Sequence, residues 1–327
     1  LIKQAKLMAS NPSERTICAR LMNDRFALCL PREEFDEKRV ADSIKELQRE
    51  FSGNSFHLHT YMGVYEIRDR DEAVSIMVDK ANIAADTIKN NYDCCVAYYD
   101  EHLLEISIEQ RRLLGEFEPA LQNDEFVMYL QPQVKRDGAA KGAEALVRWV
   151  HPSRGILTPY AFIDILENAG LIYKLDLYIW EKAAQKLAEW KEKGYGSYHI
   201  SVNISTKDFY IIDIYETFTG LINKYGIAAS NLHLEITETT LMTDFEKNMN
   251  IIHKLQGVGF RVEIDDFGSG YSSLNMLKDI SADVLKIDMG FLRKSENEVK
   301  GQDILEIIIT LAGKIGMDVI TEGVETK

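Results

Sequence analysis

Residues 261–273 read RVEIDDFGSGYSS, an apolar-alternating run that ends in two adjacent aspartates and continues into a loop rich in glycine and serine. The alternation predicts a β-strand that delivers Asp265 and Asp266 to this loop. Two neighbouring carboxylates resist ionising together unless a cation lies between them, so the pair suggests a divalent metal site. Taken alone, the same residues are also typical of a solvated turn, and the choice therefore depends on the rest of the chain.

The composition is that of a folded globular protein with an acidic surface. The 327 residues are 46% hydrophobic and 28% charged, and the chain is long enough for two domains with buried cores. The net charge of −14 argues against binding to polymeric nucleic acid or to an anionic membrane, because phosphate groups demand a basic surface. A small phosphate ligand is still compatible with this charge if a metal supplies the positive counterpart.

The cysteines and the hydropathy pattern predict a reducing environment without membrane contact. Cys18, Cys29, Cys94 and Cys95 lack zinc-site spacing, and adjacent cysteines make a poor disulfide framework, so we expect reduced thiols. The most apolar stretch, 304–315, is too short to span a bilayer, and the chain opens without a signal segment. We therefore expect a cytoplasmic location, either alone or as the cytoplasmic part of a larger membrane-anchored protein.

Short β-rich runs alternate with helical stretches after residue 124, which is typical of a parallel α/β fold. The predicted strands are 126–130, 143–150, 198–203, 232–236, 261–265, 284–287 and 318–321. The predicted helices between them are 160–169, 175–193, 209–225, 244–257 and 302–315. This order suggests a TIM-like (β/α)8 barrel over 124–327 whose last unit is missing from the chain.

In such barrels the chemistry lies at the carboxyl ends of the strands, so polar residues there carry the most information. The polar residues at these positions are Glu144, Asn203, Glu235, Glu238, Asp265, Asp266, Lys286, Glu322 and Glu325. Each lies in or beside an apolar strand, where a lone charge is costly. Five or more carboxylates around one axis require compensating cations.

Each of these residues also has a purely structural interpretation. Glu144 could pair with Arg148 on the same strand face, and Asn203 could cap a loop. The glutamates after the strands could cap the following helices, and Lys286 could be a structural ion-pair partner of Asp265 or Asp288. These interpretations conflict with one another, because one lysine and one arginine do not neutralise so many acids in one barrel mouth.

The first part of the chain predicts a small α+β unit over residues 1–107. Two short apolar runs within 17–30 indicate a β-hairpin, and the later elements are a helix at 37–51, a strand at 57–65, a helix at 71–90 and a strand at 94–99. An amphipathic stretch follows, and we expect a linker helix at 108–123.

This first unit resembles the second half of a GGDEF, or diguanylate cyclase, domain. The five positions of the family's signature hairpin read Met22-Asn23-Asp24-Arg25-Phe26. Met22 and Asn23 replace the two glycines that let the backbone approach a phosphate, and Arg25 replaces a metal-binding acid. The resemblance therefore implies a partial, degenerate GGDEF domain without cyclase activity and with a regulatory or dimerising role.

Residues 111–327 resemble an EAL domain, the fold of cyclic di-GMP phosphodiesterases, named for the segment that reads Glu144-Ala145-Leu146 here. The shared motifs, in the family's order, are QP at 131–132, EALVRW at 144–149, EITE at 235–238, DDFGSGYSS at 265–273, KID at 286–288 and EGVET at 322–326. The resemblance implies hydrolysis of cyclic di-GMP to linear pGpG, two divalent cations, and a homodimer formed through this domain. The oxygen-rich ligands suit Mg²⁺ or Mn²⁺ rather than zinc.

The resemblance also implies roles for individual residues. The metal ligands would be Glu144, Asn203, Glu235 and Asp265 for one ion, with Asp265 bridging to a second ion that Asp266 and Glu322 also serve. Lys286 matches the lysine that holds or activates the attacking water, so the expected catalytic residues are Lys286 and Glu144. The residues that match dinucleotide contacts are Gln131, Leu146 and Arg148. The residues expected to couple the 266–273 loop to dimerisation are Glu238 and Glu325.

One departure from the family concerns its last strand, which carries a Gln-Gly pair and has no counterpart before Lys327. Either the given chain is truncated there or its end is not included. Two other functions compete with hydrolysis, namely a non-hydrolysing cyclic di-GMP receptor and an interaction scaffold. Degenerate EAL receptors usually lose metal ligands, whereas this sequence keeps every ligand that its length can show, which favours the enzyme.

Overall fold

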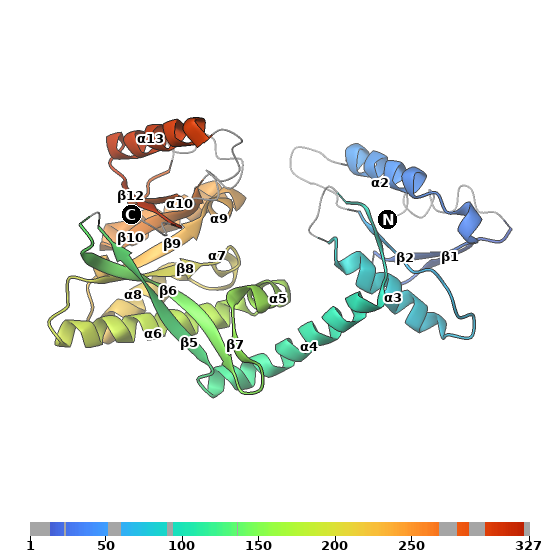
Figure 1. The fold of residues 1–327 in the computed structure, drawn as a ribbon, viewed down its shortest axis with the longest axis horizontal. Helices are drawn as coiled ribbons and strands as arrows, with labels where there is room; N and C mark the ends of the chain where they lie inside the picture. The colour runs from blue at the N-terminus through green and yellow to red at the C-terminus, as the bar shows by residue number, and fades with distance from the viewer. Residues whose placement is uncertain are drawn as a thin grey trace. The chain divides into compact units, whose positions relative to one another are not determined.

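The computed structural model describes residues 14–22, 24–51, 60–89, 94–135, 137–267, 280–287 and 298–323. The chain divides into two compact units, Leu1–Arg112 and Leu113–Lys327, and each has its own strands and helices (Figure 1). Within the described ranges, the helices are all too short or too polar to cross a lipid bilayer.

The first unit contains two small sheets. β1 (Ile17–Arg20) and β2 (Phe26–Cys29) form an antiparallel hairpin, and β3 (Met62–Val64) pairs in parallel with β4 (Val96–Tyr98). The other elements are η1 (Arg32–Glu34), α2 (Glu37–Phe51), α3 (Val74–Asp86) and the first part of α4 (Glu101–Gln122). The predicted hairpin and the predicted bounds of α2 are confirmed. The other predicted elements exist but are shorter, and parts of two of them, residues 57–59 and residue 90, lie outside the described residues.

Gly63 explains how closely α3 packs on β3. A Cβ atom built on Gly63 would lie 1.8 Å from the carbonyl oxygen of Ala81 and 2.6 Å from the amide nitrogen of Ala85. Only a residue without a side chain therefore fits under this helix. Ala84, which is fully buried, belongs to the same small-residue face of α3.

The second unit is built around one curled sheet with the strand order β12-β11-β10-β9-β8-β6-β5, and β7 pairs with β6. The strands are β5 (Phe126–Val134), β6 (Ala140–His151), β7 (Gly155–Leu157), β8 (His199–Ile204), β9 (Leu232–Thr237), β10 (Arg261–Phe267), β11 (Val284–Ile287) and β12 (Asp318–Thr321). The pairings along the order β6-β8-β9-β10-β11-β12 are all parallel. The sheet is consistent with the predicted TIM-like fold, and within the described residues its edge strands β5 and β12 do not pair with each other.

The expectation of a parallel fold is wrong for the first two strands. β5 and β6 are antiparallel, with a register that runs from Phe126↔Trp149 to Val134↔Ala140. The connection between these strands is far shorter than the dozen or so residues that a parallel crossover needs. Lys135 donates its amide to the carbonyl of Ala139 (2.9 Å) and closes the turn. β7, which pairs antiparallel with β6, was not among the predicted strands.

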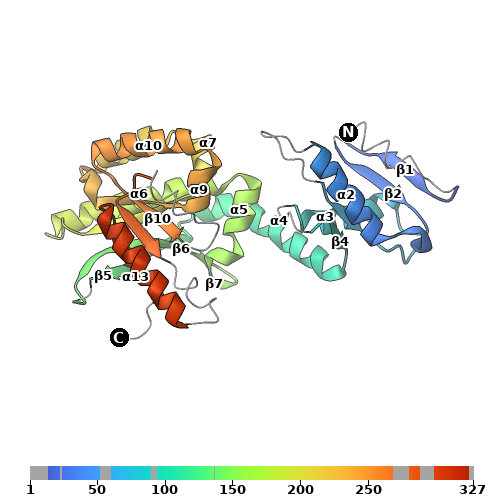
Figure 2. The ribbon, with the colours of Figure 1, turned by 90° about the horizontal axis from the view of Figure 1, so that it is seen from above.

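Helices cover the outer side of this sheet (Figures 1 and 2). The helical elements are η2 (Pro159–Ala161), α5 (Ile163–Ala169), α6 (Ile172–Glu192), α7 (Asp208–Ile211), α8 (Ile214–Tyr225), η3 (Ala229–Asn231), α9 (Glu238–Thr243), α10 (Phe245–Val258) and α13 (Glu298–Lys314). The helix predicted at 209–225 is split into α7 and α8, because Asp213 caps α8 by accepting a hydrogen bond from the amide of Glu216 (3.0 Å). The sequence analysis missed α9, whose single turn and a half is too short to show a periodic pattern.

An aromatic cluster joins the end of α4 to the sheet. Phe126 of β5 packs against Trp149 of β6 with 4.8 Å between ring centroids, and Phe117 of α4 lies 5.7 Å from Phe126. All three side chains are almost completely buried. Burial of such large apolar surfaces stabilises the fold by a few kcal/mol per side chain, roughly 1.5–3, and it anchors the strand that carries Glu144.

Candidate active site

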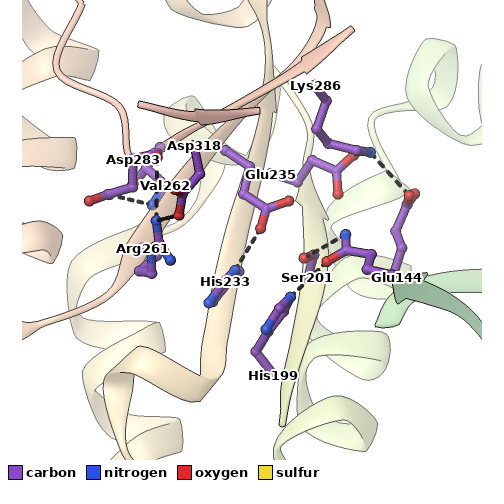
Figure 3. A network of polar contacts seen from close by, with 12 residues as sticks. Glu144, His199, Ser201, His233, Glu235, Arg261, Val262, Asp283, Lys286 and Asp318 are labelled. Carbon is purple, nitrogen blue, oxygen red and sulfur yellow. Dashed lines mark hydrogen bonds and ion pairs between the residues drawn. The ribbon is translucent and has the colours of Figure 1, made fainter. Parts of the chain in front are cut away.

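Polar side chains from successive parallel strands form one layer at the carboxyl ends of the sheet. Asn203 of β8 is in register with Glu235 of β9, while Glu144 lies on β6, Asp265 on β10 and Lys286 on β11. Glu322 directly follows β12. Figure 3 shows Lys286, Glu235 and Glu144 pointing toward one another from these different strands. The layer therefore brings together residues that are up to 178 positions apart in the sequence, from 144 to 322.

Lys286 lies at the centre of four carboxylates. Its Nζ atom lies 3.0 Å from Glu144 Oε2, 2.7 Å from Glu322 Oε1 and 3.3 Å from Asp265 Oδ1. It also donates a hydrogen bond to Glu235 Oε1. Lys286 is 1% exposed and Glu235 is fully buried. When all five groups are ionised, one positive charge faces four negative charges, and the cluster carries an excess of negative charge inside the fold.

Burial and charge shift the pKa values in this cluster in a consistent way. Burial alone lowers the pKa of Lys286, but the carboxylates of Glu235, Asp265 and Glu144 outweigh it and hold the pKa above its ordinary value. Burial raises the pKa of Glu235 well above its ordinary value, although Lys286 opposes the shift. Burial also raises the pKa of Glu322. Lys286 is therefore an ammonium at neutral pH, while burial opposes ionisation of Glu235 and Glu322.

The donor atoms of this cluster fit hard divalent cations. One oxygen each of Glu144, Glu235 and Glu322 can be chosen so that all three lie within 4.8 Å of one another. Glu235 Oε2 is buried and has no hydrogen-bond partner among the described residues. Asn203 donates Nδ2–H to Glu144 Oε1 (3.5 Å), and its Oδ1 is a further oxygen on the same side chain. All these donors are carboxylate or amide groups, the ligands that Mg²⁺ and Mn²⁺ prefer.

A β-bulge explains how two consecutive aspartates can serve one site. The pairing of β10 with β11 shifts register between Ile264 and Phe267, and Asp266 has a φ of 56°, in the left-handed region. In a regular strand, neighbouring side chains point to opposite faces. A bulge with a left-handed residue re-aims a side chain at such a strand end. Asp265 faces Lys286, and Asp266 is exposed at the end of the strand.

The residues that match dinucleotide contacts lie on the same antiparallel pair as Glu144. Gln131 of β5 is paired with Glu144 of β6, and Leu146 is paired with Tyr129. The guanidinium of Arg148 lies 5.8 Å from the centre of the Tyr129 ring. Gln131 therefore lies opposite Glu144 of the carboxylate cluster, and Leu146 and Arg148 follow Glu144 on the same face of β6.

The residues expected to couple the loop are only partly described. Glu238 is the first residue of α9 and follows β9, the strand that carries Glu235. Glu325 and the 268–273 loop lie outside the described residues, as does Asp288. The coupling role therefore stays a prediction.

Sequence reasoning missed the support of Asn203 by Trp180. Trp180 of α6 donates its Nε1–H to the backbone carbonyl of Asn203 (2.9 Å) and packs against Phe218 with 4.5 Å between ring centroids. Both rings are fully buried. A tryptophan at an apolar position of a helix is ordinarily a core residue, and no local pattern indicates the strand-end carbonyl that it holds.

The chain is similar to known EAL-domain proteins. A model of the EAL domain matches residues 115–327. MucR of Pseudomonas aeruginosa, named a bifunctional diguanylate cyclase/cyclic di-GMP phosphodiesterase, is 30% identical over 337 residues that cover 100% of this chain and 48% of MucR. The cyclic di-GMP phosphodiesterase PdeR of Escherichia coli is 32% identical over 207 residues, which cover 63% of this chain and 31% of PdeR.

Solved structures are similar over the second unit. The PaMucR phosphodiesterase in complex with c-di-GMP is 33% identical, with a TM-score of 0.62, and the match covers 66% of this chain and 88% of that chain. The chain spans less than half the length of MucR and of PdeR.

Proposed function

The chain belongs to the EAL-domain family, and on that premise we propose that its second unit hydrolyses cyclic di-GMP to linear pGpG. One observation carries the proposal, namely the gathering of Glu144, Glu235, Asp265 and Glu322 around the buried Lys286. A protein that only bound the dinucleotide would have no need for this costly excess of carboxylates around one buried lysine.

Two divalent cations, Mg²⁺ or Mn²⁺, complete the site in this proposal. Glu144, Asn203, Glu235 and Asp265 would hold one ion, and Asp265, Asp266 and Glu322 the second. When bound, such ions lower the pKa of water and stabilise the entering and leaving oxygens of a phosphodiester during in-line attack. The orphaned Glu235 Oε2 and the all-oxygen donor set support this assignment.

Lys286 acts in this proposal as a donor and not as a base. The surrounding carboxylates hold its pKa above the ordinary value, so Nζ is assigned the role of an ammonium donor. From its central position, Nζ orients the attacking water and stabilises the negative charge that develops on the phosphoryl oxygens. The oxygen of the water bonds to phosphorus, the bond from phosphorus to the 3′-oxygen of one nucleotide breaks, and one proton of the water ends on that 3′-oxygen. The ring thus opens to the linear product.

The β5–β6 pair would hold the substrate beside this centre. Arg148 supplies a positive charge for the phosphates, and Gln131 and Leu146 contact the rest of the dinucleotide. Tyr129 faces Leu146 across the pair and lies under the guanidinium of Arg148, which limits where that side chain can swing. The pair thus allows an acidic protein to bind a dianion at one locally basic place.

We further propose that the first unit is a partial GGDEF-like domain with a regulatory or dimerising role, and that the protein forms a homodimer through its EAL domain. Arg25 lies 3.8 Å from Asp86, where the family's signature would carry a metal-binding acid, and this supports a non-catalytic unit. Exposed isoleucines on α13, of which Ile307 is 62% exposed, supply apolar surface for a protein contact.

Direct measurement of the reaction tests the proposal. Purified protein is incubated with cyclic di-GMP and Mg²⁺ or Mn²⁺, and the products are separated by chromatography. We expect linear pGpG with either ion and none in the presence of EDTA, because the carboxylates alone cannot activate water. Glu144→Gln serves as the matched inactive control. Cyclic di-GMP that binds but stays intact in the wild-type sample would instead identify a receptor.

The stabilising effect of Mg²⁺ is expected to increase with pH. Burial raises the pKa of Glu235 and of Glu322 in the folded protein. In EDTA, the folded state is favoured as long as Glu235 and Glu322 are protonated, which holds below the ordinary pKa of glutamate. This stability is lost as the pH rises through their raised pKa in the folded protein. Mg²⁺ binds the ionised forms and cancels this loss. The difference between the Tm in Mg²⁺ and the Tm in EDTA should therefore grow between about pH 5 and 8, and a constant difference would contradict the assignment.

A further inference from the structure

A second polar layer lies one step deeper along the same strands, toward their amino ends. His233 and Glu263 each precede a residue of the carboxylate cluster, Glu235 and Asp265, by two positions on the same strand, so they share its inward face. His199 begins β8. Figure 3 shows His199 and His233 side by side, away from Lys286. The proposed reaction uses none of these three residues.

These three side chains form a compact and buried cluster. His233 Nδ1 lies 2.6 Å from Glu263 Oε1, and the rings of His199 and His233 have 3.8 Å between centroids. One donor atom of each residue can be chosen so that all three lie within 4.8 Å of one another. His233 is 3% exposed and Glu263 is fully buried, whereas His199 keeps partial contact with solvent.

We propose that His199, His233 and Glu263 form a second metal site, for Zn²⁺ or a similar transition metal, separate from the oxygen-rich site. Two imidazoles and one carboxylate are a donor set that suits zinc, with the fourth position left to water. The carboxylate cluster around Lys286 has only oxygen donors, so the two sites differ in the class of metal that they select.

The charges around Glu263 support a cation in this place. Glu263 Oε2 is buried and has no hydrogen-bond partner among the described residues. The neighbouring Arg261 directs Nη2 to Asp318 Oδ2 (2.7 Å) and to the carbonyl of Asp283 (3.3 Å), so its charge is used elsewhere. Burial, aided by His233, lowers the pKa of His199 to about 4, and a neutral imidazole is the form that binds metal.

The surroundings of His199 resemble those of a metal ligand. His199 Nε2 lies 2.7 Å from Gln133 Oε1, and Gln133 Nε2 donates in turn to Ser201 Oγ (3.4 Å). A hydrogen bond from Nε2–H to Gln133 fixes the tautomer and leaves Nδ1 free to coordinate. Gly142 makes room for this ring, because a Cβ atom there would lie 2.5 Å from His199 Nε2.

Binding requires one of the two rings to turn. Their planes differ by only 3°, and an ion cannot lie in the planes of two stacked rings at once. The torsional minimum for rotation about the Cβ–Cγ bond of a histidine is broad, so turning one ring costs little energy. A bound ion would then link β8, β9 and β10, the three strands that carry Asn203, Glu235 and Asp265. It would fix the spacing of these strands on the amino-terminal side of the carboxylate cluster.

The test measures the metal content of a protein in which two proposed ligands of the carboxylate cluster have been replaced. Glu144→Gln/Glu322→Gln protein is stripped with a chelator, titrated with Zn²⁺ and desalted, and its zinc is measured by mass spectrometry. Co²⁺ is used as a spectroscopic probe, because four-coordinate Co²⁺ with histidine ligands absorbs far more strongly in the visible range than Co²⁺ bound only by oxygen. We expect one zinc per chain and the strong cobalt bands.

Added substitutions locate the site and decide the outcome. His199→Gln and Glu263→Gln should each lower the zinc affinity by at least roughly tenfold, and Gln133→Leu by about tenfold, the lower end for a residue that orients a ligand. The exposed His253→Gln is the matched control and should change nothing. Folding of each variant is checked by circular dichroism, and His199→Gln, at a partly exposed position, keeps the test valid if Glu263→Gln fails to fold. Zinc binding that is absent, or that survives both His199→Gln and His233→Gln, overturns the proposal without touching the proposed hydrolysis.

Discussion

Lys286→Met is expected to lower the stability of the protein in EDTA by about 3–5 kcal/mol, the range for removing one partner of a buried ion pair. The substitution leaves Glu144, Glu235, Asp265 and Glu322 with no positive charge among them. Their mutual repulsion then has no internal counterweight. Turnover of cyclic di-GMP should fall about 10²–10³-fold, as when one donor to a developing oxyanion is removed.

Divalent cations separate the two parts of this expectation. Mg²⁺ supplies positive charge to the carboxylates and should restore much of the stability of Lys286→Met, but it cannot restore the lost Nζ donor. Urea unfolding in EDTA and in Mg²⁺, together with kcat in Mg²⁺, measures both effects. Lys254→Met, at an exposed position of α10, is the matched control, and such surface changes usually stay within about 0.5 kcal/mol. Equal urea midpoints for Lys286→Met and wild type in EDTA would show that the four carboxylates do not gather around Lys286.

The sequence contained enough information to place the strands of the second unit. Alternating apolar residues mark β10, a short apolar run marks β11, and a polar residue near the end of each marks the edge where the site lies. These signals are local, and burial of one strand face makes them strong. The same reasoning brought Glu144, Glu235, Asp265, Lys286 and Glu322 into one proposed site, and the structure gathers these five side chains.

The features that the sequence did not reveal depend on pairing between distant strands. The antiparallel β5–β6 pair follows from a short connection, residues 135–139, whereas the predicted strand bounds left residues 131–142 between the strands, which is long enough for a crossover. The bulge at Asp265–Asp266 arises from the register of β10 against β11, and a single strand carries no record of its neighbour's register. The cluster of His199, His233 and Glu263 was missed for the same reason, because these residues meet only through strand pairing.

Glu235→Gln is expected to have the opposite effect on stability to Lys286→Met. In EDTA near pH 8 it should stabilise the protein by about 1 kcal/mol, a typical size for the effect of one substitution, because the cost of burying a charge is removed. Burial holds the pKa of Glu235 well above its ordinary value, and glutamine has nearly the same shape without the charge. Lys286 keeps three other carboxylates as partners.

The same substitution should abolish most of the response to metal. Changing a group that only supports the ligands weakens metal binding roughly 10–100-fold, so loss of a ligand itself should weaken Mg²⁺ binding by more. The kcat at a fixed Mg²⁺ concentration should fall as a consequence. Thermal unfolding of Glu235→Gln with and without Mg²⁺ measures the response, and Glu192→Gln, exposed at the end of α6, is the matched control. If Mg²⁺ still stabilised Glu235→Gln strongly, Glu235 would not be a metal ligand. A clear loss of stability in EDTA would mean that the ion pair with Lys286 outweighs the cost of burying the charge, and the cluster would then be a structural salt bridge that needs no metal.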